Sequence, residues 1–188
     1  PRCSQGSLLG GWGPLHPFVI FSGVPVSFQP PWLLRVKAAG LTPVPFSFEP
    51  AEVREALGKL LLANEVSEGS ARIYMVHNRV GFWQSDETMP QVDLVLCTAD
   101  LPAHPQDARL TIAEQGRHAA GPLAGVKSTS WLNNVWHLAE AQTQGWPEFI
   151  LLKERVEFAE STTPNTLCAR RGVFSTPQSA SGLLAGVT

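Results

Sequence analysis

Two segments of the sequence place a side chain capable of chemistry beside a turn-forming stretch. Lys127 lies between GPLAGV and a segment that predicts a helix start, and a lysine amine can act as a nucleophile or move a proton when it loses solvation. Glu160 follows three alternating residues and opens the segment ESTTPN, so we expect it at a strand end. Taken singly, they are better interpreted as a surface lysine and a solvated carboxylate, although a cation is slightly disfavoured at a helix start.

Motifs for several other kinds of chemistry are missing from the sequence. It contains no GxGxxG, GxxxxGK[ST], GxSxG or HExxH motif. Five scattered histidines show no pairing with another His or Cys at ligand spacing: His16, His77, His104, His118 and His137. We therefore predict no metal site. We expect His137 to be a surface or half-buried residue in the middle of a helix rather than a catalytic base.

The elements that must position these residues begin with a predicted α+β unit. FEPAEVREALGKLLLANEV predicts an amphipathic helix that ends near Asn64, with one face formed by Val53, Ala56, Leu57, Leu60 and Leu61. The short segments ARIYMVHN, QVDLVLCTA and ARLTIAEQ predict strands. Before the helix, the prolines of GVPVSFQPPWLL exclude a central strand. Closely spaced Gly and Pro residues then predict a linker at 116–126, between a small domain (1–115) and the first part of a large domain (127–188).

After Lys127 the pattern predicts a helix followed by a β-meander. STSWLNNVWHLAEAQTQG has Leu132, Val135, Trp136 and Ala139 at helical spacing and is closed by Gly145. EFILLKE, RVEFAES, NTLCARR and GVFSTP predict four short strands joined by tight turns. There is no alternation of strands and helices of the nucleotide-binding kind.

Composition narrows the class of protein. Of 188 residues, 44% are hydrophobic and 16% charged, which predicts a well-buried globular chain. A net charge of -2 gives no basic footprint for nucleic acid, and no apolar run is long enough to span a membrane. Cys3, Cys97 and Cys168 lie far apart, which fits a reducing, cytoplasmic location. Because the chain begins with Pro1 and ends just after LLAGVT, we expect a truncated C-terminus.

The order of these segments resembles the class IV (fold type IV) pyridoxal-phosphate enzymes, which include branched-chain and D-amino acid aminotransferases and 4-amino-4-deoxychorismate lyase. That family has a lysine, a helix rich in Ala and Glu, a strand, E-x-[ST]-x-x-N, a hydrophobic-x-T and L-x-G-[IV]-T. This chain has GVKSTSWLNNVWHLAEAQTQG, EFILL, ESTTPN, FST and LLAGVT in the same order. The resemblance is strong over residues 117–188 and weaker over 47–115. It implies a two-domain D-amino acid aminotransferase-like fold with a small α/β domain and a larger β-rich domain.

The resemblance also implies three points of attachment for pyridoxal 5'-phosphate. Lys127 matches the catalytic lysine, whose amine forms a Schiff base with the cofactor aldehyde. Glu160 matches the carboxylate that keeps the ring nitrogen protonated. Val187 and Thr188 match the turn whose N–H groups bind the phosphate. Leu184 matches an aliphatic residue packed against the ring face.

Toward the N-terminus the family motifs are altered. Arg35, in PPWLLRVKAAG, corresponds to the arginine of H-x-x-R-L that reaches the phosphate, but the motif's histidine is missing, since Trp32 lies three residues before Arg35. LGGWGPLHPFVI stands in place of YGDGVFETIR and lacks its aspartate and glutamate. Trp131 lies near the place of a tyrosine beside the cofactor's phenolic oxygen, and an indole donates a hydrogen bond without accepting one.

By resemblance we expect an aminotransferase that moves an amino group between an amino acid, branched-chain-like or D, and a 2-oxo acid. One alternative is a 4-amino-4-deoxychorismate lyase, which would use the same anchors to release pyruvate. A second alternative is an inactive or incomplete family member with a binding or structural role, because of the altered N-terminal motifs. The resemblance further implies a homodimer with its site between small and large domains. We expect neither nucleic acid nor membrane as a partner.

Overall fold

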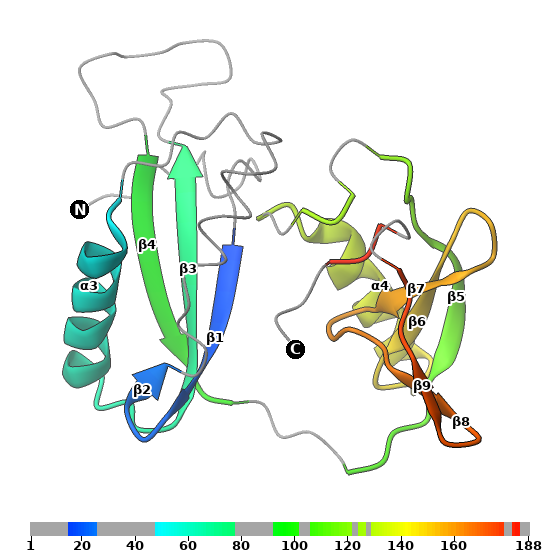
Figure 1. Cartoon of the computed structure of the whole chain (residues 1–188), viewed down its shortest axis with the longest axis horizontal. Helices are drawn as coiled ribbons and strands as arrows, with labels where there is room; N and C mark the ends of the chain where they lie inside the picture. The colour runs from blue at the N-terminus through cyan, green and yellow to red at the C-terminus, as the bar shows by residue number, and fades with distance from the viewer. Residues whose placement is uncertain are drawn as a thin grey trace. The chain divides into compact units, whose positions relative to one another are not determined.

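A computed structural model describes residues 15–25, 48–77, 92–101, 106–121, 124–126, 129–178 and 182–184. The chain divides into two compact units (Figure 1). Unit 1 comprises Pro1–Ala103 with Lys127–Ser130, and unit 2 comprises His104–Val126 with Trp131–Thr188. The expected division differs, because residues 104–115 fall in unit 2 rather than in the small domain, and residues 116–126 fall inside a unit rather than between two.

Unit 1 contains an antiparallel sheet with the strand order β2-β1-β3-β4. Its strands are β1 (Leu15–Phe21), β2 (Val24–Pro25), β3 (Gly69–His77) and β4 (Val92–Ala99). The expected strands at 71–78 and 91–99 are confirmed as β3 and β4. No strand was predicted over residues 15–21, so β1 is a finding of the structure. Pro17 pairs with Arg72 of β3, and β2 reaches only Ile20 and Phe21, so in the described residues Pro17 needs no ladder hydrogen bond on its other side.

Helix α3 (Pro50–Ala63) confirms the predicted amphipathic helix. Pro50 begins it with a backbone angle suited to a first turn, and the Glu52 carboxylate accepts a hydrogen bond from the Glu49 backbone N–H at 3.0 Å. The expected face is the buried one: Val53, Leu57 and Leu61 pack on the sheet of unit 1. This apolar layer forms the core of unit 1.

Unit 2 contains a three-stranded sheet with the order β5-β6-β7. Its strands are β5 (Thr111–Arg117), β6 (Phe149–Lys153) and β7 (Phe158–Ser161), and helix α4 (Leu132–Thr143) lies between β5 and β6 in the sequence. Strands β5 and β6 are parallel, while β6 and β7 are antiparallel. The expected strand at 108–115 therefore does not belong to the first α+β unit, since its partner is β6.

The predicted meander is also only partly correct. Strands β8 (Cys168–Arg170) and β9 (Val173–Ser175) exist near the expected positions, but they form a separate two-stranded sheet. Their two-residue turn has positive φ at Arg171 (51°) and Gly172 (77°), which is the conformation that joins tight hairpins. The local turns were therefore predictable, whereas the partner of each strand was not.

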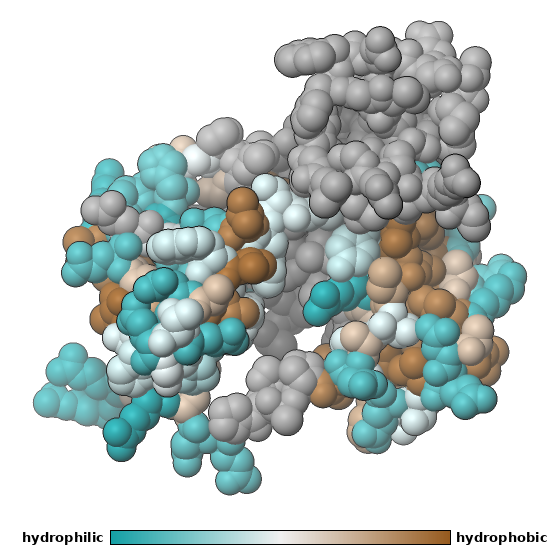
Figure 2. Space-filling view, turned by 180° about the vertical axis from the view of Figure 1, so that it is seen from behind, coloured by the Kyte–Doolittle hydropathy of each residue, from teal (hydrophilic) through white to brown (hydrophobic). Residues whose placement is uncertain are grey.

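Helix α4 differs from its prediction in the face that it buries. The buried residues are Asn134, His137 and Ala141, whereas Leu132 and Trp136, two of the apolar residues at helical spacing, are 79% and 59% exposed. Figure 2 shows hydrophobic side chains on the surface of both units. The polar face of α4 turns inward because Asn134 hydrogen bonds there, and this face lies at the candidate site.

Candidate active site

Glu160 is the centre of a polar cluster in unit 2. It lies in β7 opposite Leu151 of β6 and is 5% exposed. One carboxylate oxygen, Oε1, forms an ion pair with Nη2 of Arg117. The other, Oε2, accepts a hydrogen bond from the Leu184 backbone N–H at 3.0 Å. The expectation of a strand-end carboxylate is confirmed, but Glu160 is buried and paired rather than solvated.

Arg117, at the end of β5, is the cation that this carboxylate requires. A buried carboxylate is costly unless a cation and hydrogen-bond donors compensate it. Strand β5 approaches β6 closely because Gly116 has no side chain: a Cβ there would lie 2.7 Å from Leu151 Cδ2. Arg117 was not predicted as a site residue. Its position at the end of a strand was the one indication in the sequence, and the partner of that strand was not predicted.

Two neighbouring asparagines in the first turn of α4 form hydrogen bonds with the end of β5 and with the residue that follows β7. Asn134 accepts a hydrogen bond from Arg117 Nη1 at 3.2 Å and donates one to the Thr162 carbonyl at 2.8 Å. Asn133 donates to the Gly116 carbonyl at 2.9 Å. The sequence analysis assigned no role to either residue. Side-chain amides both donate and accept, so Asn134 can link Arg117 to the strand end that follows Glu160.

Leu184, one of the expected cofactor-binding residues, is held beside Glu160 by both of its backbone groups. Its N–H contacts Glu160, and its carbonyl accepts a hydrogen bond from Asn165 Nδ2 at 2.8 Å. The last residue of ESTTPN therefore holds the start of LLAGVT. The side chain of Leu184 is half-buried. The structure thus places Leu184 and Glu160, two of the expected site residues, in contact with each other.

The segment before Lys127 passes close to the segment that carries Leu184. A Cβ on Gly182 would lie 2.7 Å from Ala119 Cα, and one on Gly125 would lie 3.2 Å from the Leu183 carbonyl. Both glycines have positive φ, 71° and 76°, so the two chain segments can approach without side-chain clashes. The turn that precedes the expected lysine thus lies against the turn that precedes the expected phosphate-binding residues.

Glu154 fixes the beginning of the same loop. Its carboxylate accepts hydrogen bonds from the backbone N–H groups of Ala119 and Ala120, at 3.0 and 3.3 Å, and it lies 3.6 Å from His118 Nδ1. The hydrogen bond from Ala119 is the main reason that the pKa of Glu154 lies below its ordinary value. This contact ties the loop after Arg117 to the turn between β6 and β7.

The segment ESTTPN is held by a second carboxylate, that of Glu148, the residue immediately before β6. Its Oε2 accepts hydrogen bonds from Ser161 Oγ at 3.1 Å, from Thr162 Oγ1 at 2.7 Å and from the Thr163 backbone N–H at 3.0 Å. Oε1 accepts one from the Thr163 hydroxyl. The hydroxyl groups of this segment therefore fix the turn between Glu160 and Asn165.

Four of the expected site residues, Lys127, Arg35, Val187 and Thr188, lie outside the described residues. The described part fits the ring-nitrogen end of a pyridoxal phosphate site. A carboxylate has about four acceptor positions, and contacts with the described residues use two of those of Glu160. A buried carboxylate with unused acceptor positions can bind the N–H of a protonated heteroaromatic ring.

His137, one turn after Asn134, is 8% exposed, so it is more buried than the sequence predicted. Burial lowers the pKa of its imidazole. Its Nδ1 has no hydrogen-bond partner among the described residues, and its ring meets Trp136 edge-on with a centroid separation of 4.8 Å. These contacts describe a packed, neutral histidine of α4.

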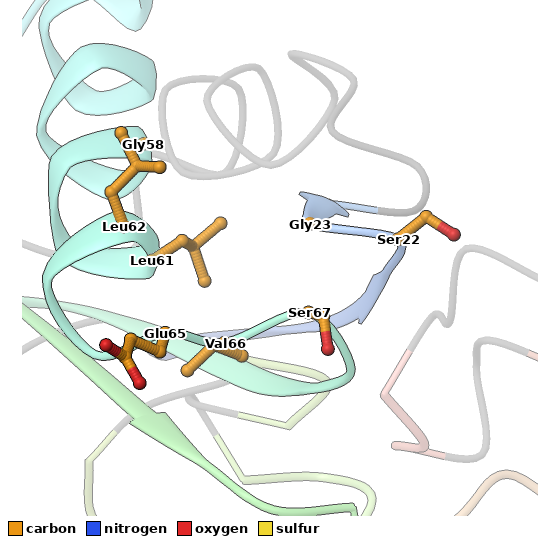
Figure 3. Close-up of a pocket in the computed structure, with 8 residues that line it drawn as sticks. All are labelled: Ser22, Gly23, Gly58, Leu61, Leu62, Glu65, Val66 and Ser67. Atoms are coloured by element: carbon orange, nitrogen blue, oxygen red, sulfur yellow. The ribbon is translucent and has the colours of Figure 1, made fainter.

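Unit 1 contains a pocket of about 570 Å³, and the described residues that line it do not include the expected site residues. Figure 3 shows that it is lined by the C-terminal half of α3, the β1–β2 turn and the connection from α3 to β3, with Leu61 pointing from the helix toward Gly23. Most of its described lining is apolar or small, and Glu65 is the one ionisable residue among the described residues that line it.

Among the described residues, no group of three or more His, Cys, Asp or Glu side chains is arranged to hold a metal ion. None of the helices in that part of the chain has the length and apolar character needed to cross a membrane.

Comparison with protein families gives a match over most of the chain. The model of the family "Amino-transferase class IV" matches residues 34–188. No curated protein matches the sequence. The family evidence therefore comes from a sequence pattern that includes the segments of both units.

Solved structures give the same fold at low sequence identity. The branched-chain amino acid aminotransferase of Escherichia coli is 18% identical, with a TM-score of 0.85 over 99% of this chain and 66% of its own. The 4-amino-4-deoxychorismate lyase of Pseudomonas aeruginosa is 21% identical, with a TM-score of 0.77 over 100% and 71%. A hypothetical aminotransferase from Mycobacterium tuberculosis, in its PLP-bound form, is 18% identical, with a TM-score of 0.79 over 99% and 69%. The chain thus spans about two thirds of the length of these structures.

Proposed function

This chain belongs to the class IV aminotransferase family, and we propose that it transfers an amino group between an amino acid and a 2-oxo acid. The family is that of pyridoxal-phosphate enzymes, and a structural neighbour is solved with the cofactor bound. The fold is the mixed α and β fold of type IV aminotransferases. The amino acid that we propose as substrate is branched-chain-like or a D-amino acid.

The single observation that carries the proposal is the arrangement around Glu160. Its buried carboxylate has a compensating cation in Arg117 and a backbone donor in Leu184. A site for a protonated ring needs an acceptor position that the chain leaves unused and a carboxylate whose direction is fixed. Among the described residues, the contacts of Glu160 meet both conditions.

We propose these roles for the residues of the site. Lys127 supplies the amine that bonds to the cofactor and moves the proton at the substrate Cα. Glu160 holds the ring nitrogen, and Leu184 packs against the ring. Val187 and Thr188 donate backbone N–H groups to the phosphate, and Arg35 adds a cation there.

Bound pyridoxal phosphate supplies an electron-accepting ring, which stabilises negative charge at the substrate Cα. The chain's task is to orient that ring and to keep its nitrogen protonated. Glu160 is suited to this task because burial excludes water from its carboxylate, while Arg117 and the Leu184 N–H fix its direction. Lys127 must then exchange protons with the substrate on one face of the ring.

A lyase acting on 4-amino-4-deoxychorismate is the second candidate, and its support is the likeness to the lyase from Pseudomonas aeruginosa. Both reactions would use the same anchors. Parallel assays distinguish them: amino transfer to 2-oxoglutarate against release of pyruvate from aminodeoxychorismate.

We propose a homodimer and a cytoplasmic location for the protein. The dimer follows from the resemblance alone. The location is supported by the exposed, free thiols of Cys97 and Cys168, which are typical of a reducing compartment.

The test of the proposed function is covalent trapping of the cofactor. We expect the chain, incubated with pyridoxal phosphate and reduced with borohydride, to carry the cofactor on the peptide that contains Lys127. The matched control is Lys153→Arg, on β6, which should leave labelling unchanged, whereas Lys127→Arg should abolish it. Absence of any labelled peptide would contradict the proposal, and a label on another lysine would contradict the role of Lys127.

A further inference from the structure

Asn134 contacts two groups that flank Glu160 without touching Glu160 itself. Its Oδ1 accepts the hydrogen bond from Arg117 Nη1 at 3.2 Å, and its Nδ2 donates to the Thr162 carbonyl at 2.8 Å. It is 5% exposed, so water does not replace these contacts easily. Arg117 is the ion-pair partner of Glu160, and Thr162 follows Glu160 by two residues in the chain.

We infer that Asn134 is a positioning residue for the contact between Glu160 and the cofactor's ring nitrogen, an inference that rests on the proposed function. The guanidinium is a rigid planar fork, so an acceptor that fixes the direction of Nη1 also fixes where Nη2 meets the carboxylate. Arg117 Nε is buried and has no hydrogen-bond partner among the described residues. Among the described residues, Asn134 and Glu160 are therefore the two side chains that orient the Arg117 guanidinium, through Nη1 and Nη2 respectively.

The second hydrogen bond of Asn134 serves the same contact. By donating to Thr162, it ties the end of β7 to helix α4. A side-chain amide can accept from a guanidinium and donate to a carbonyl at the same time. An aspartate cannot donate and would compete with Glu160 for the guanidinium, and a leucine can do neither.

The adjacent Asn133 provides a matched control. It lies on the same turn of α4 and also donates a hydrogen bond to a backbone carbonyl, that of Gly116, at 2.9 Å. Substitution at either position removes one side chain–backbone hydrogen bond from the same helix. Only substitution at Asn134 removes an acceptor from Arg117.

The experiment compares the binding of two cofactors, pyridoxal phosphate and its 1-deaza analogue, which lacks the ring nitrogen. Dissociation constants are measured by quenching of tryptophan fluorescence in the full chain, and thermal unfolding is measured without cofactor. We expect Asn134→Leu to weaken binding of pyridoxal phosphate about tenfold, in the usual range of coupling between residues in one network. Binding of the deaza analogue should change little, so the preference for a ring nitrogen falls.

The variants Asn133→Leu and Asn133→Asp should keep the wild-type preference, even where their melting temperatures fall. Asn134→Asp should lose that preference, which keeps the test decisive if Asn134→Leu does not fold. Wild-type preference in both Asn134 variants would overturn the inference and leave the proposed function standing. If the wild-type chain binds neither compound, the proposed function fails and the inference fails with it.

Discussion

At the scale of single residues, the charge of Glu160 is balanced by Arg117, and we expect the loss of either partner to destabilise unit 2. The two side chains are 6% and 21% exposed, so solvent screens their interaction only partly. Removal of one partner leaves an uncompensated charge, which costs about 3 kcal/mol for a buried pair. Arg117→Met should therefore lower the free energy of unfolding by about that amount, measured by urea titration.

The control for this prediction is the double variant Arg117→Met with Glu160→Gln. Since it removes both charges, it should recover part of the stability lost in Arg117→Met alone. Strict additivity of the two single substitutions would show that the ion pair does not carry the effect.

At the scale of elements, the parallel pairing of β5 with β6 requires a small residue at position 116. A Cβ on Gly116 would lie 2.7 Å from Leu151 Cδ2 and 3.3 Å from Leu151 Cα, so β5 would have to move away from the strand opposite Glu160. We expect Gly116→Ala to destabilise the protein by about 1–3 kcal/mol, as overpacking usually does. It should also weaken pyridoxal phosphate binding, since Arg117 is the next residue.

Gly58 in α3 is the opposite case and serves as the control. No atom lies within 4 Å of a Cβ placed there, and alanine is favoured over glycine in a helix by about 0.5–1 kcal/mol. Gly58→Ala should therefore stabilise unit 1 slightly, with cofactor binding unchanged. Equal effects of the two substitutions in thermal unfolding would contradict the packing argument.

At the scale of the whole molecule, two groups with lowered pKa make stability depend on pH. Burial lowers the pKa of His137 below its ordinary value of 6.5, so the native state favours the neutral imidazole. As the pH falls below 6.5, the unfolded chain takes up a proton that the native state resists, and stability decreases. The carboxylate of Glu154 is stabilised in the native state, so its contribution is present above 4.5 and is lost as the pH falls through its lowered pKa.

We therefore expect the melting temperature to fall in two stages on acidification, first below pH 6.5 and again below pH 4.5. The first stage should be reduced in His137→Leu, and the second in Glu154→Gln, which loses the charge that caps Ala119. The measurement is differential scanning fluorimetry between about pH 7 and pH 5. If the first fall in melting temperature is unchanged in His137→Leu, His137 is not its source.

The local elements and the order of the site's segments along the chain could be predicted from sequence patterns. Helix α3, the tight β8–β9 turn and the strand that carries Glu160 follow from patterns within a few neighbouring residues. The resemblance identified Glu160 and Leu184, which the structure brings into contact. Such signals are short-range, or depend on order along the chain, and both are readable from one sequence.

Three features depend on contacts between distant segments and are visible in the folded units alone: which strands pair, which face of α4 is buried, and which cation compensates the buried carboxylate. The pairing of β5 with β6 joins segments separated by a whole helix, and periodicity within a segment carries no information about its partner. Helix α4 turns Asn134 inward and leaves Leu132 exposed, because Arg117 and the Thr162 carbonyl need hydrogen-bond partners there. Burial of a charge is a property of the assembled unit, so its cation could be found only when the distant strands were brought together.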